Sequence, residues 1–354
     1  MPAKGEDSFA QRVIGWQQTH GRHDLPWQNT RDPYGIWVSE IMLQQTQVSA
    51  VVGYYQRFME RFPDVASLAT APNDEVMRHW AGLGYYSRAR NLHRAAQLVM
   101  DRHGGAFPRG QEEIEALPGI GRSTAAAIRA FAFGARAAIL DGNVKRVFAR
   151  HAGIAGYPGL PKIEKQMWQL ADERLPQGGL EPYIQGLMDL GATLCTRGRP
   201  RCKDCPVATD CVARRENRTA ELPTRKPKKE LPQRETMMLV LMRAGSVLLE
   251  KRPPTGIWGG LWSLPQAEDD SAARKLAQAF GADWKSRESL NVIEHGFTHY
   301  HLSIKPLLLT AKVSLATEEP GHVWLPLAEA KDAALPSPVK KLLTSLAAGT
   351  PLFD

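Results

Sequence analysis

The spacing of apolar residues changes beyond the middle of the chain. Through about residue 213 they recur every three or four positions, in segments mostly separated by Gly or Pro. Examples are EIMLQQTQVSAVVGYYQRFM, RARNLHRAAQLVMDRH and NVKRVFARHAG. Because this spacing is typical of amphipathic helices, residues 1–213 are predicted to be all-α.

After residue 235 the apolar residues alternate with polar ones, which is typical of strands. TMMLVLMR and SVLLEKR flank a short Ala-Gly turn and predict a hairpin. FTHYHLSIKPLLLTAKV predicts one or two strands, and SPVKKLLTSLAA predicts a closing helix. Residues 236–354 are therefore predicted to form a smaller α+β domain. The charged, proline-containing segment 214–235 is predicted to be the linker, and a length of 354 residues agrees with about two domains.

Positive charge is concentrated in one part of the chain. The net charge is +8, and residues 195–234 hold 12 Lys and Arg against 5 Asp and Glu. Such a segment favours a polyanionic partner, because contacts to phosphates release counterions; a solvated linker is the alternative after Arg214. The start of the chain is polar and no apolar run approaches the ~20 residues of a membrane span, so we expect a soluble cytoplasmic protein without membrane association.

All four cysteines lie in one short segment, with the spacing C-x6-C-x2-C-x5-C: Cys195, Cys202, Cys205 and Cys211. Disulfides are uncommon inside cells, so the clustering favours a four-thiolate metal site. Both Zn²⁺ and an iron–sulfur cluster accept four cysteines, and zinc is the commoner structural ion. The basic loop TRGRPR between the first two cysteines is predicted either to contact phosphate or to be only solvated.

The segment LPGIGRSTAAAIRA predicts a tight turn between two helices. Gly119 and Gly121 permit positive φ angles and close approach of another backbone. The unpaired N–H groups that begin the second helix are suited to a phosphate, without regard to base sequence. A plain turn between two helices is the alternative.

Two acidic residues stand out. In GIWVSEIMLQQTQV, Glu40 lies one turn from Ile36, Trp37 and Leu43, on an apolar helix face. Either that helix is less buried than its pattern indicates, or Glu40 pairs with an Arg, or burial keeps it protonated by raising its pKa by up to ~3–5 units. Asp141, about twenty residues after the Gly turn, predicts a helix N-cap or an anion beside a developing cation.

The turn, the later Asp and the cysteine spacing together resemble the helix–hairpin–helix DNA glycosylases that carry an iron–sulfur cluster, the endonuclease III-like superfamily. Within it the match is to the adenine DNA glycosylase (MutY) family. It rests on LPW at 25–27, WVSEIMLQQTQV at 37–48, GLGYYSRARNL at 82–92, LPGIGRSTA at 117–125 and LDGNVKRV at 140–147. With the linker and the C-terminal domain, the likeness spans nearly the whole chain.

The resemblance implies a fold and an activity. The fold would be a six-helix barrel at about 26–136, a cluster subdomain from about 1–25 and 137–213, and a Nudix-like domain at 236–354. The four cysteines would hold one [4Fe–4S] cluster in place of zinc, with no catalytic metal. The activity would be removal of adenine mispaired with 8-oxoguanine or guanine in double-stranded DNA, by a monomer.

The resemblance also implies roles for single residues. Glu40 would protonate N7 of an adenine flipped out of the duplex, Asp141 would stabilise the sugar oxocarbenium ion, and Asn143 would help to position them. Gln185 would lie near the adenine. The remaining DNA contacts would come from Gln45 and Tyr85, inserted near 8-oxoguanine, and from the hairpin residues Leu117, Gly119, Gly121 and Ser123.

Ser123 bears on the type of reaction. Bifunctional relatives, which also cut the strand, have a Lys at this position that forms a Schiff base with the sugar. Serine cannot form that imine, so the resemblance implies a monofunctional glycosylase that leaves an abasic site.

The C-terminal domain resembles a Nudix domain without its hydrolytic residues. WGGLWSLPQ at 258–266 resembles the region before a Nudix box, but the next segment, AEDDSAARKLAQAFGADW, lacks the box's metal-binding carboxylates. The domain is therefore predicted not to hydrolyse nucleotides, and the resemblance implies that it recognises 8-oxoguanine. HGFTHYH at 295–301 matches the family's reading loop through Phe297, Thr298 and His299, although the family has Ser where this chain has Thr298.

Three alternatives remain open. One is an endonuclease III-like glycosylase and lyase that acts on oxidised pyrimidines, which Ser123 and the C-terminal domain disfavour. Another is a non-catalytic DNA-binding metal protein, which Glu40 and Asp141 disfavour. The third is a zinc site in the C-terminal domain, since alternation along a strand would place three histidines on one face: His295, His299 and His301.

Overall fold

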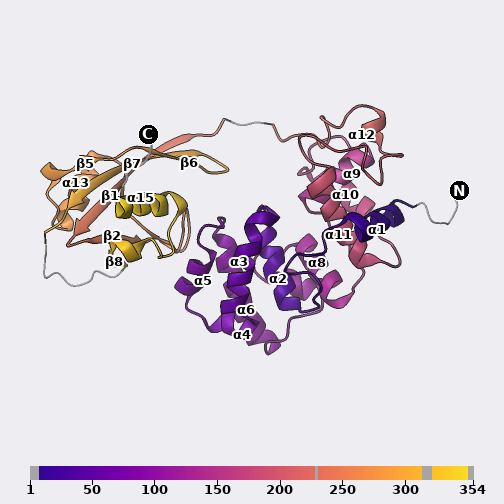
Figure 1. The fold of residues 1–354 in the computed structure, drawn as a ribbon, viewed down its shortest axis with the longest axis horizontal. Helices are drawn as coiled ribbons and strands as arrows, with labels where there is room; N and C mark the ends of the chain where they lie inside the picture. The colour runs from indigo at the N-terminus through magenta and orange to yellow at the C-terminus, as the bar shows by residue number, and fades with distance from the viewer. Residues whose placement is uncertain (1–7, 228–229, 313–320, 350–354) are drawn as a thin grey trace. The chain divides into compact units, whose positions relative to one another are not determined.

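The computed structural model describes residues 8–227, 230–312 and 321–349, which form two units (Figure 1). The first unit contains the described residues up to 70 and those from 91 to 227. The second contains residues 71–90 and the described residues from 230 onward. In these ranges, no helix combines the length and the apolar character that crossing a bilayer would require.

The first unit is helical, which confirms the predicted all-α half. Its helices are α1 (Phe9–His20), α2 (Pro33–Leu43), α3 (Val48–Arg61), α4 (Val65–Thr70), most of α6 (Ser87–His103), α7 (Gln111–Glu115), α8 (Arg122–Phe133), α9 (Gly142–His151), α10 (Pro161–Glu173), α11 (Leu180–Asp189), the π-helix η1 (Leu190–Leu194) and α12 (Val212–Arg215).

The helix from the start of the chain packs against a helix far along it. Ser8 caps α1 by accepting a hydrogen bond from Gln11 N, and α1 contacts α11. Gly186 permits this approach, because a Cβ atom there would lie 2.8 Å from Val13 Cγ1. The two helices share an apolar core with α8, α9 and α10.

Helix α2 is buried on nearly every side. It begins at Pro33, and the Asp32 side chain accepts hydrogen bonds from Tyr34 N and Gly35 N at 3.1 and 3.0 Å. Eight of its 11 residues are buried, and it contacts both α3 and α8. The prediction of a single apolar face was therefore too narrow: Glu40 belongs to a core helix.

The second unit contains a mixed sheet, which confirms the predicted α+β half. The predicted hairpin is formed by β1 (Gln233–Arg243) and β2 (Ser246–Lys251), joined at Ala244 and Gly245, which have φ angles of 47° and 78°. Strand β1 begins inside the segment predicted to be a linker. It also pairs in parallel with β7 (His301–Thr310).

The strands follow the order β3-β2-β1-β7-β5, while β4, β6 and β8 pair with β1, β7 and β2. Helix α13 packs on β1 and β4. The predicted closing helix is α15. The remaining bounds are α5 (Asn73–Trp80), β3 (Trp262–Ser263), β4 (Gln266–Ala267), α13 (Asp270–Ala279), the 3-10 helix η2 (Trp284–Ser286), β5 (Glu288–Ser289), β6 (Ile293–Gly296), β8 (His322–Pro326), α14 (Leu327–Ala330) and α15 (Ser337–Ala348).

The segment FTHY is a turn and not a strand, which corrects the prediction. Phe297 N donates to Tyr300 O at 2.9 Å, and this bond closes the connection from β6 to β7. His299 therefore does not lie in a strand, so it does not share a strand face with His295 and His301 as the histidine zinc site required. Across the described ranges, no three His, Cys, Asp or Glu side chains are grouped to hold a metal ion, so the alternative of a zinc site at His295, His299 and His301 was wrong.

Candidate active site

Glu40 lines two cavities of the first unit, of about 190 Å³ and 390 Å³. Burial raises the pKa of Glu40 to about 8, and the negative charge of Asp141 adds to the shift. No group in the described ranges makes a hydrogen bond or ion pair with the Glu40 carboxyl. The alternative of an Arg partner is therefore wrong, and the carboxyl is held in a largely protonated state at neutral pH.

The smaller cavity lies between α2, α11 and the loop before α2. Apolar walls come from Leu25, Trp27 and Ile36, and Gln185 adds a polar amide. Trp27 is buried and meets the Tyr55 ring edge-on at 5.4 Å between centroids. A cavity with these walls can take a small flat ring, with Glu40 as its ionisable group.

The larger cavity places Asp141 beside Glu40, although 101 residues separate them in the sequence. Asp141 caps α9, as predicted: its Oδ1 accepts from Val144 N at 2.8 Å and its Oδ2 from Asn143 Nδ2 at 3.2 Å. Burial raises the pKa of Asp141, and these two hydrogen bonds oppose the shift. They stabilise the ionised carboxylate in a buried position.

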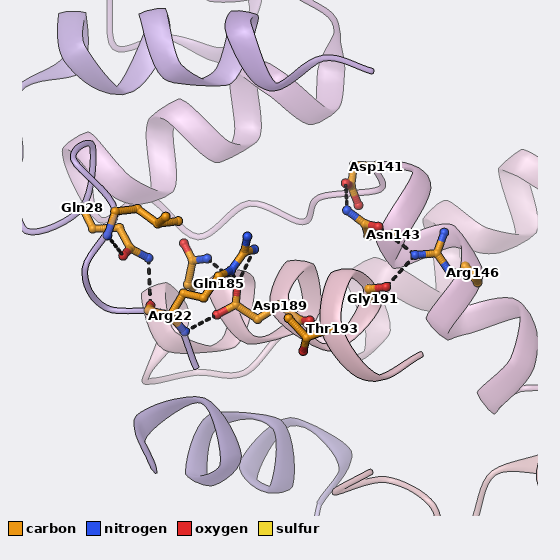
Figure 2. A network of polar contacts seen from close by, with 10 residues as sticks. Arg22, Gln28, Asp141, Asn143, Arg146, Gln185, Asp189, Gly191 and Thr193 are labelled. Carbon is orange, nitrogen blue, oxygen red and sulfur yellow. Dashed lines mark hydrogen bonds and ion pairs between the residues drawn. The ribbon is translucent and has the colours of Figure 1, made fainter. Parts of the chain in front are cut away.

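Asn143 is held from the other side by Arg146, as Figure 2 shows. Arg146 Nη2 donates to Asn143 Oδ1 at 2.8 Å and to Gly191 O at 2.6 Å, and its Nε donates to Cys195 O at 2.7 Å. Gly191 allows η1 to lie against α9, since a Cβ atom there would be 2.5 Å from Asn143 Cβ. Sequence reasoning did not find Arg146, because two of its partners, Gly191 and Cys195, lie 45 and 49 residues away.

Gln185 also has a partner that the sequence did not reveal. Its Nε2 donates to Asp189 Oδ1 at 2.9 Å, and Asp189 forms an ion pair with Arg22 (Figure 2). Arg22 and Asp189 are 167 residues apart. Only their meeting in the fold identifies them, because neither lies in a recognisable motif.

The Gly turn between α7 and α8 is present, but only one glycine uses the left-handed region. Gly119 has φ 83°, and a Cβ atom there would lie 3.0 Å from Asn91 Cβ. Gly121 has a φ angle of −106°, so the expectation of a positive φ angle was wrong for this residue. Gly121 is the N-cap of α8, and no side chain caps this helix. Leu117 is buried. The backbone N–H groups that start α8 are thus without a capping side chain.

Ser123 lies on the first turn of α8 and lines the larger cavity with Glu40 and Asp141. Its Oγ accepts a hydrogen bond from Leu140 N at 3.0 Å. The hydroxyl therefore fixes the backbone immediately before Asp141.

Gln45 and Tyr85 share an uncommon backbone conformation. Their φ angles are 58° and 49°, a region that costs residues with a Cβ about 1–2 kcal/mol. Both side chains are exposed, Tyr85 by 44%. Gln45 follows α2 and lines the larger cavity; Tyr85 belongs to the second unit. Such strain is often found at functional positions.

The turn at Phe297–Tyr300 forms an aromatic cluster in the second unit. The Phe297 ring lies 5.6 Å from Trp258 and 4.7 Å from Tyr300, measured between centroids. Thr298 and His299 are exposed at the tip. The cluster therefore presents one hydroxyl and one imidazole on a rigid base.

The four cysteines border one cavity of about 30 Å³ and form no disulfide. Arg150 Nη1 donates to Cys195 Sγ at 3.3 Å. Burial raises the pKa of Cys205 to about 11 and also raises that of Cys211. Within the described ranges the thiols are not grouped closely enough to hold a metal ion as they stand, although all four border one cavity.

Comparisons with known proteins agree with this arrangement. The family model "HhH-GPD superfamily base excision DNA repair protein" matches residues 38–173, and a NUDIX domain model matches residues 236–345. A solved thermostable thymine-DNA glycosylase is 32% identical, with a TM-score of 0.54, over 59% of this chain and 95% of that chain. An endonuclease III–DNA complex, 21% identical with a TM-score of 0.51 over 59% and 94%, shares the fold.

A curated relative matches almost end to end. The adenine DNA glycosylase of Buchnera aphidicola subsp. Baizongia pistaciae is 36% identical over 340 residues, which cover 96% of this chain and 96% of the relative. This confirms the predicted family and the predicted combination of a helix–hairpin–helix region with a Nudix-like domain. The chain belongs to the adenine DNA glycosylase family of DNA repair enzymes.

Proposed function

We propose that this protein is a monofunctional glycosylase that hydrolyses the N-glycosidic bond of adenine mispaired with 8-oxoguanine or guanine in duplex DNA. The observation that carries the proposal is the pair of carboxyl groups in one cavity, with the pKa of Glu40 raised to about 8 and Asp141 held by two N–H donors. Paired carboxyl groups with separate roles are the usual machinery for cleaving a glycosidic bond.

Glu40 acts first as the general acid. An adenine extruded from the duplex enters the smaller cavity, and the neutral Glu40 carboxyl donates its proton to N7. The bond between C1′ and N9 then breaks, and its electron pair leaves with the base. Because N7 carries the proton, adenine departs as a neutral molecule.

Asp141 stabilises the cation that remains on the sugar. Hydrogen bonds from Val144 N and Asn143 Nδ2 favour its ionised form, and Arg146 keeps the Asn143 amide in place. Water then adds to C1′, and the Glu40 carboxylate accepts the proton that the water loses. This returns Glu40 to its starting state and leaves an abasic site.

DNA binding is assigned to groups that can contact the DNA whatever its base sequence. The uncapped start of α8, after Gly119 and Gly121, is suited to a backbone phosphate. The exposed loop before Cys202 adds Arg197, Arg199 and Arg201. Gln45 and Tyr85, whose strained backbones point their side chains outward, are proposed to enter the base stack and offset part of the flipping cost of a few kcal/mol.

We assign one [4Fe–4S] cluster to Cys195, Cys202, Cys205 and Cys211. Both a zinc ion and an iron–sulfur cluster accept four cysteines, and the family resemblance favours the cluster. Four thiols that border one cavity and form no disulfide support a four-thiolate site. When bound, it would hold the basic loop rigid, and no step of base removal passes through it.

The second unit is proposed to recognise 8-oxoguanine through Phe297, Thr298 and His299. The exposed Thr298 hydroxyl and His299 imidazole stand on an aromatic base that can also stack with a lesion base. Asp269, one of the few acids near the expected Nudix box, caps α13 by accepting from Ala272 N at 2.8 Å. This use of the carboxylate disfavours metal-dependent nucleotide hydrolysis.

The test is incubation of the full chain with a duplex that contains adenine opposite 8-oxoguanine, followed by analysis of strand breaks with and without alkali. We expect breaks at adenine only after alkali, and none in a matched duplex with adenine opposite thymine. Breaks without alkali would indicate a lyase. Binding without any breaks would indicate a non-catalytic DNA-binding protein and overturn the proposal.

A further inference from the structure

Asp189 is a fully buried acid at the end of α11 that the proposed mechanism does not use. Figure 2 shows it between Arg22, from the loop after α1, and Gln185, one turn earlier on its own helix. Asp189 does not line either of the Glu40 cavities; Arg22 lines both of them, and Gln185 lines the smaller one. The Asp189 carboxylate therefore does not border the smaller cavity itself but contacts two residues that do.

The contacts of Asp189 fix it completely. Oδ1 accepts from Arg22 Nε at 2.7 Å and from Gln185 Nε2 at 2.9 Å, and Oδ2 accepts from Arg22 N at 2.9 Å. Arg22 Nη2 lies 2.5 Å from Oδ1, so the buried charge is neutralised. The loop that carries Arg22 is tied down as well, because Gln28 Nε2 donates to Arg22 O at 2.9 Å.

This arrangement determines which end of the Gln185 amide faces the cavity. A carboxylate only accepts hydrogen bonds, so the Gln185 NH₂ group must point toward Asp189. The other end of the amide, Oε1, then points away from Asp189, and no group in the described ranges hydrogen-bonds it. Gln185 is half-buried and borders the smaller cavity with Glu40. The cavity thus presents an acceptor in addition to the protonated acid.

We propose that the Arg22–Asp189 ion pair is a positioning device that locks the amide of Gln185 with its carbonyl oxygen toward the base. The inference rests on the proposed function, and it assigns selectivity for the 6-amino group of adenine. The 6-amino group of adenine can donate a hydrogen bond to Gln185 Oε1. The 6-oxo group of hypoxanthine cannot, because it would place a second acceptor against that oxygen. A site that leaves a buried polar group unpaired discriminates more strongly than one that only loses contact area.

The test compares bases rather than overall activity. Wild-type protein is assayed under single-turnover conditions on duplexes with adenine or hypoxanthine opposite 8-oxoguanine, and the ratio of the two rates is recorded. Gln185→Leu removes the oriented amide. The double variant R22M/D189L removes the anchor and avoids an unpaired buried charge. Glu173→Leu is the matched control, because it breaks an equivalent Gln169–Glu173 contact on the exposed face of α10.

We expect the ratio of adenine to hypoxanthine removal to fall about 10-fold in Q185L, the scale of one lost hydrogen bond. R22M/D189L should show a similar fall, and the triple variant should fall no further, because all three changes disable one amide. E173L should keep the wild-type ratio. Thermal unfolding of each variant reports whether it is folded.

An unchanged ratio in Q185L would overturn the proposal, and that variant alters no buried charge, so its folding is not at issue. A wild-type ratio in folded R22M/D189L, or a further fall in the triple variant, would also overturn the role of the ion pair. Failure of the proposed function would look different: wild-type protein would not release adenine opposite 8-oxoguanine at all.

Discussion

Glu40 and Asp141 line the same cavity, and the charge of Asp141 helps to raise the pKa of Glu40. One helix buries the first acid, and the N-terminus of another donates a hydrogen bond to the second. Two carboxyl groups of similar intrinsic acidity thus have different surroundings: burial and the charge of Asp141 favour the neutral form of Glu40, while hydrogen bonds from Val144 N and Asn143 Nδ2 oppose the effect of burial on Asp141.

Glu40→Gln should nearly abolish adenine release and leave DNA binding measurable. The amide keeps the size of the side chain but has no acidic proton, so we expect a loss of about 10²–10⁴-fold in single-turnover rate. Alkali-dependent strand cleavage measures the rate, and gel mobility of the mispaired duplex measures binding. A rate within threefold of wild type would rule out Glu40 as the acid.

The rate of base release should fall as the pH rises through about 8, where Glu40 loses its proton. The folded protein binds this proton more tightly than the unfolded chain, whose Glu has its ordinary pKa of 4.5. The contribution of Glu40 to the free energy of unfolding is therefore greatest below 4.5 and declines between 4.5 and about 8. Urea titrations of wild type and E40Q across this range should show a steeper decline in wild type; parallel curves would contradict it.

Ser123→Lys should add strand cleavage to base removal. Ser123 lines the cavity that contains Asp141, so an amine there can attack C1′ and form a Schiff base. We expect breaks without alkali and a covalent DNA adduct after borohydride reduction. Ser123→Ala also loses the acceptor for Leu140 N but supplies no amine, and it should form no adduct. An adduct of equal yield in S123A would assign the chemistry to another residue.

The purified protein should contain iron and no zinc, with about four iron atoms per chain if the cluster is complete. Cys202→Ser removes one of the four thiols that border the cavity, and we expect its iron content and brown absorbance to fall well below wild type. Metal analysis by mass spectrometry measures both elements. Stoichiometric zinc in colourless, active protein would refute the cluster.

Ala244→Asn should stabilise the second unit by up to about 1 kcal/mol. Ala244 has φ 47° in the β1–β2 turn, a region that Asn occupies more readily than Ala. Gly245→Ala is the opposite control, and it should lower the free energy of unfolding by about 1 kcal/mol. The φ angle of Gly245 is 78°, and a Cβ atom there would meet nothing within 4 Å, so the loss would come from backbone strain and not from a clash. Urea unfolding of each variant gives the difference, and equal stability of A244N and wild type would contradict the turn assignment.

The sequence by itself determined the features that depend on neighbouring residues. Periodicity separated the helical half from the α+β half, the Ala-Gly pair marked the β1–β2 turn, and Asp141 was recognisable as an N-cap. Local patterns failed where packing decided the outcome. Helix α2 is buried on nearly all sides, Gly121 has an ordinary extended backbone, and FTHY closes a turn because Phe297 bonds to Tyr300.

Only the tertiary structure decided which distant residues meet. Glu40 and Asp141, 101 residues apart, line one cavity, and Arg22 reaches Asp189 across 167 residues because α1 packs against α11. The pKa of Glu40 and the orientation of Gln185 follow from those meetings. Desolvation and hydrogen-bond geometry depend on surroundings in space, which no spacing along the chain contains.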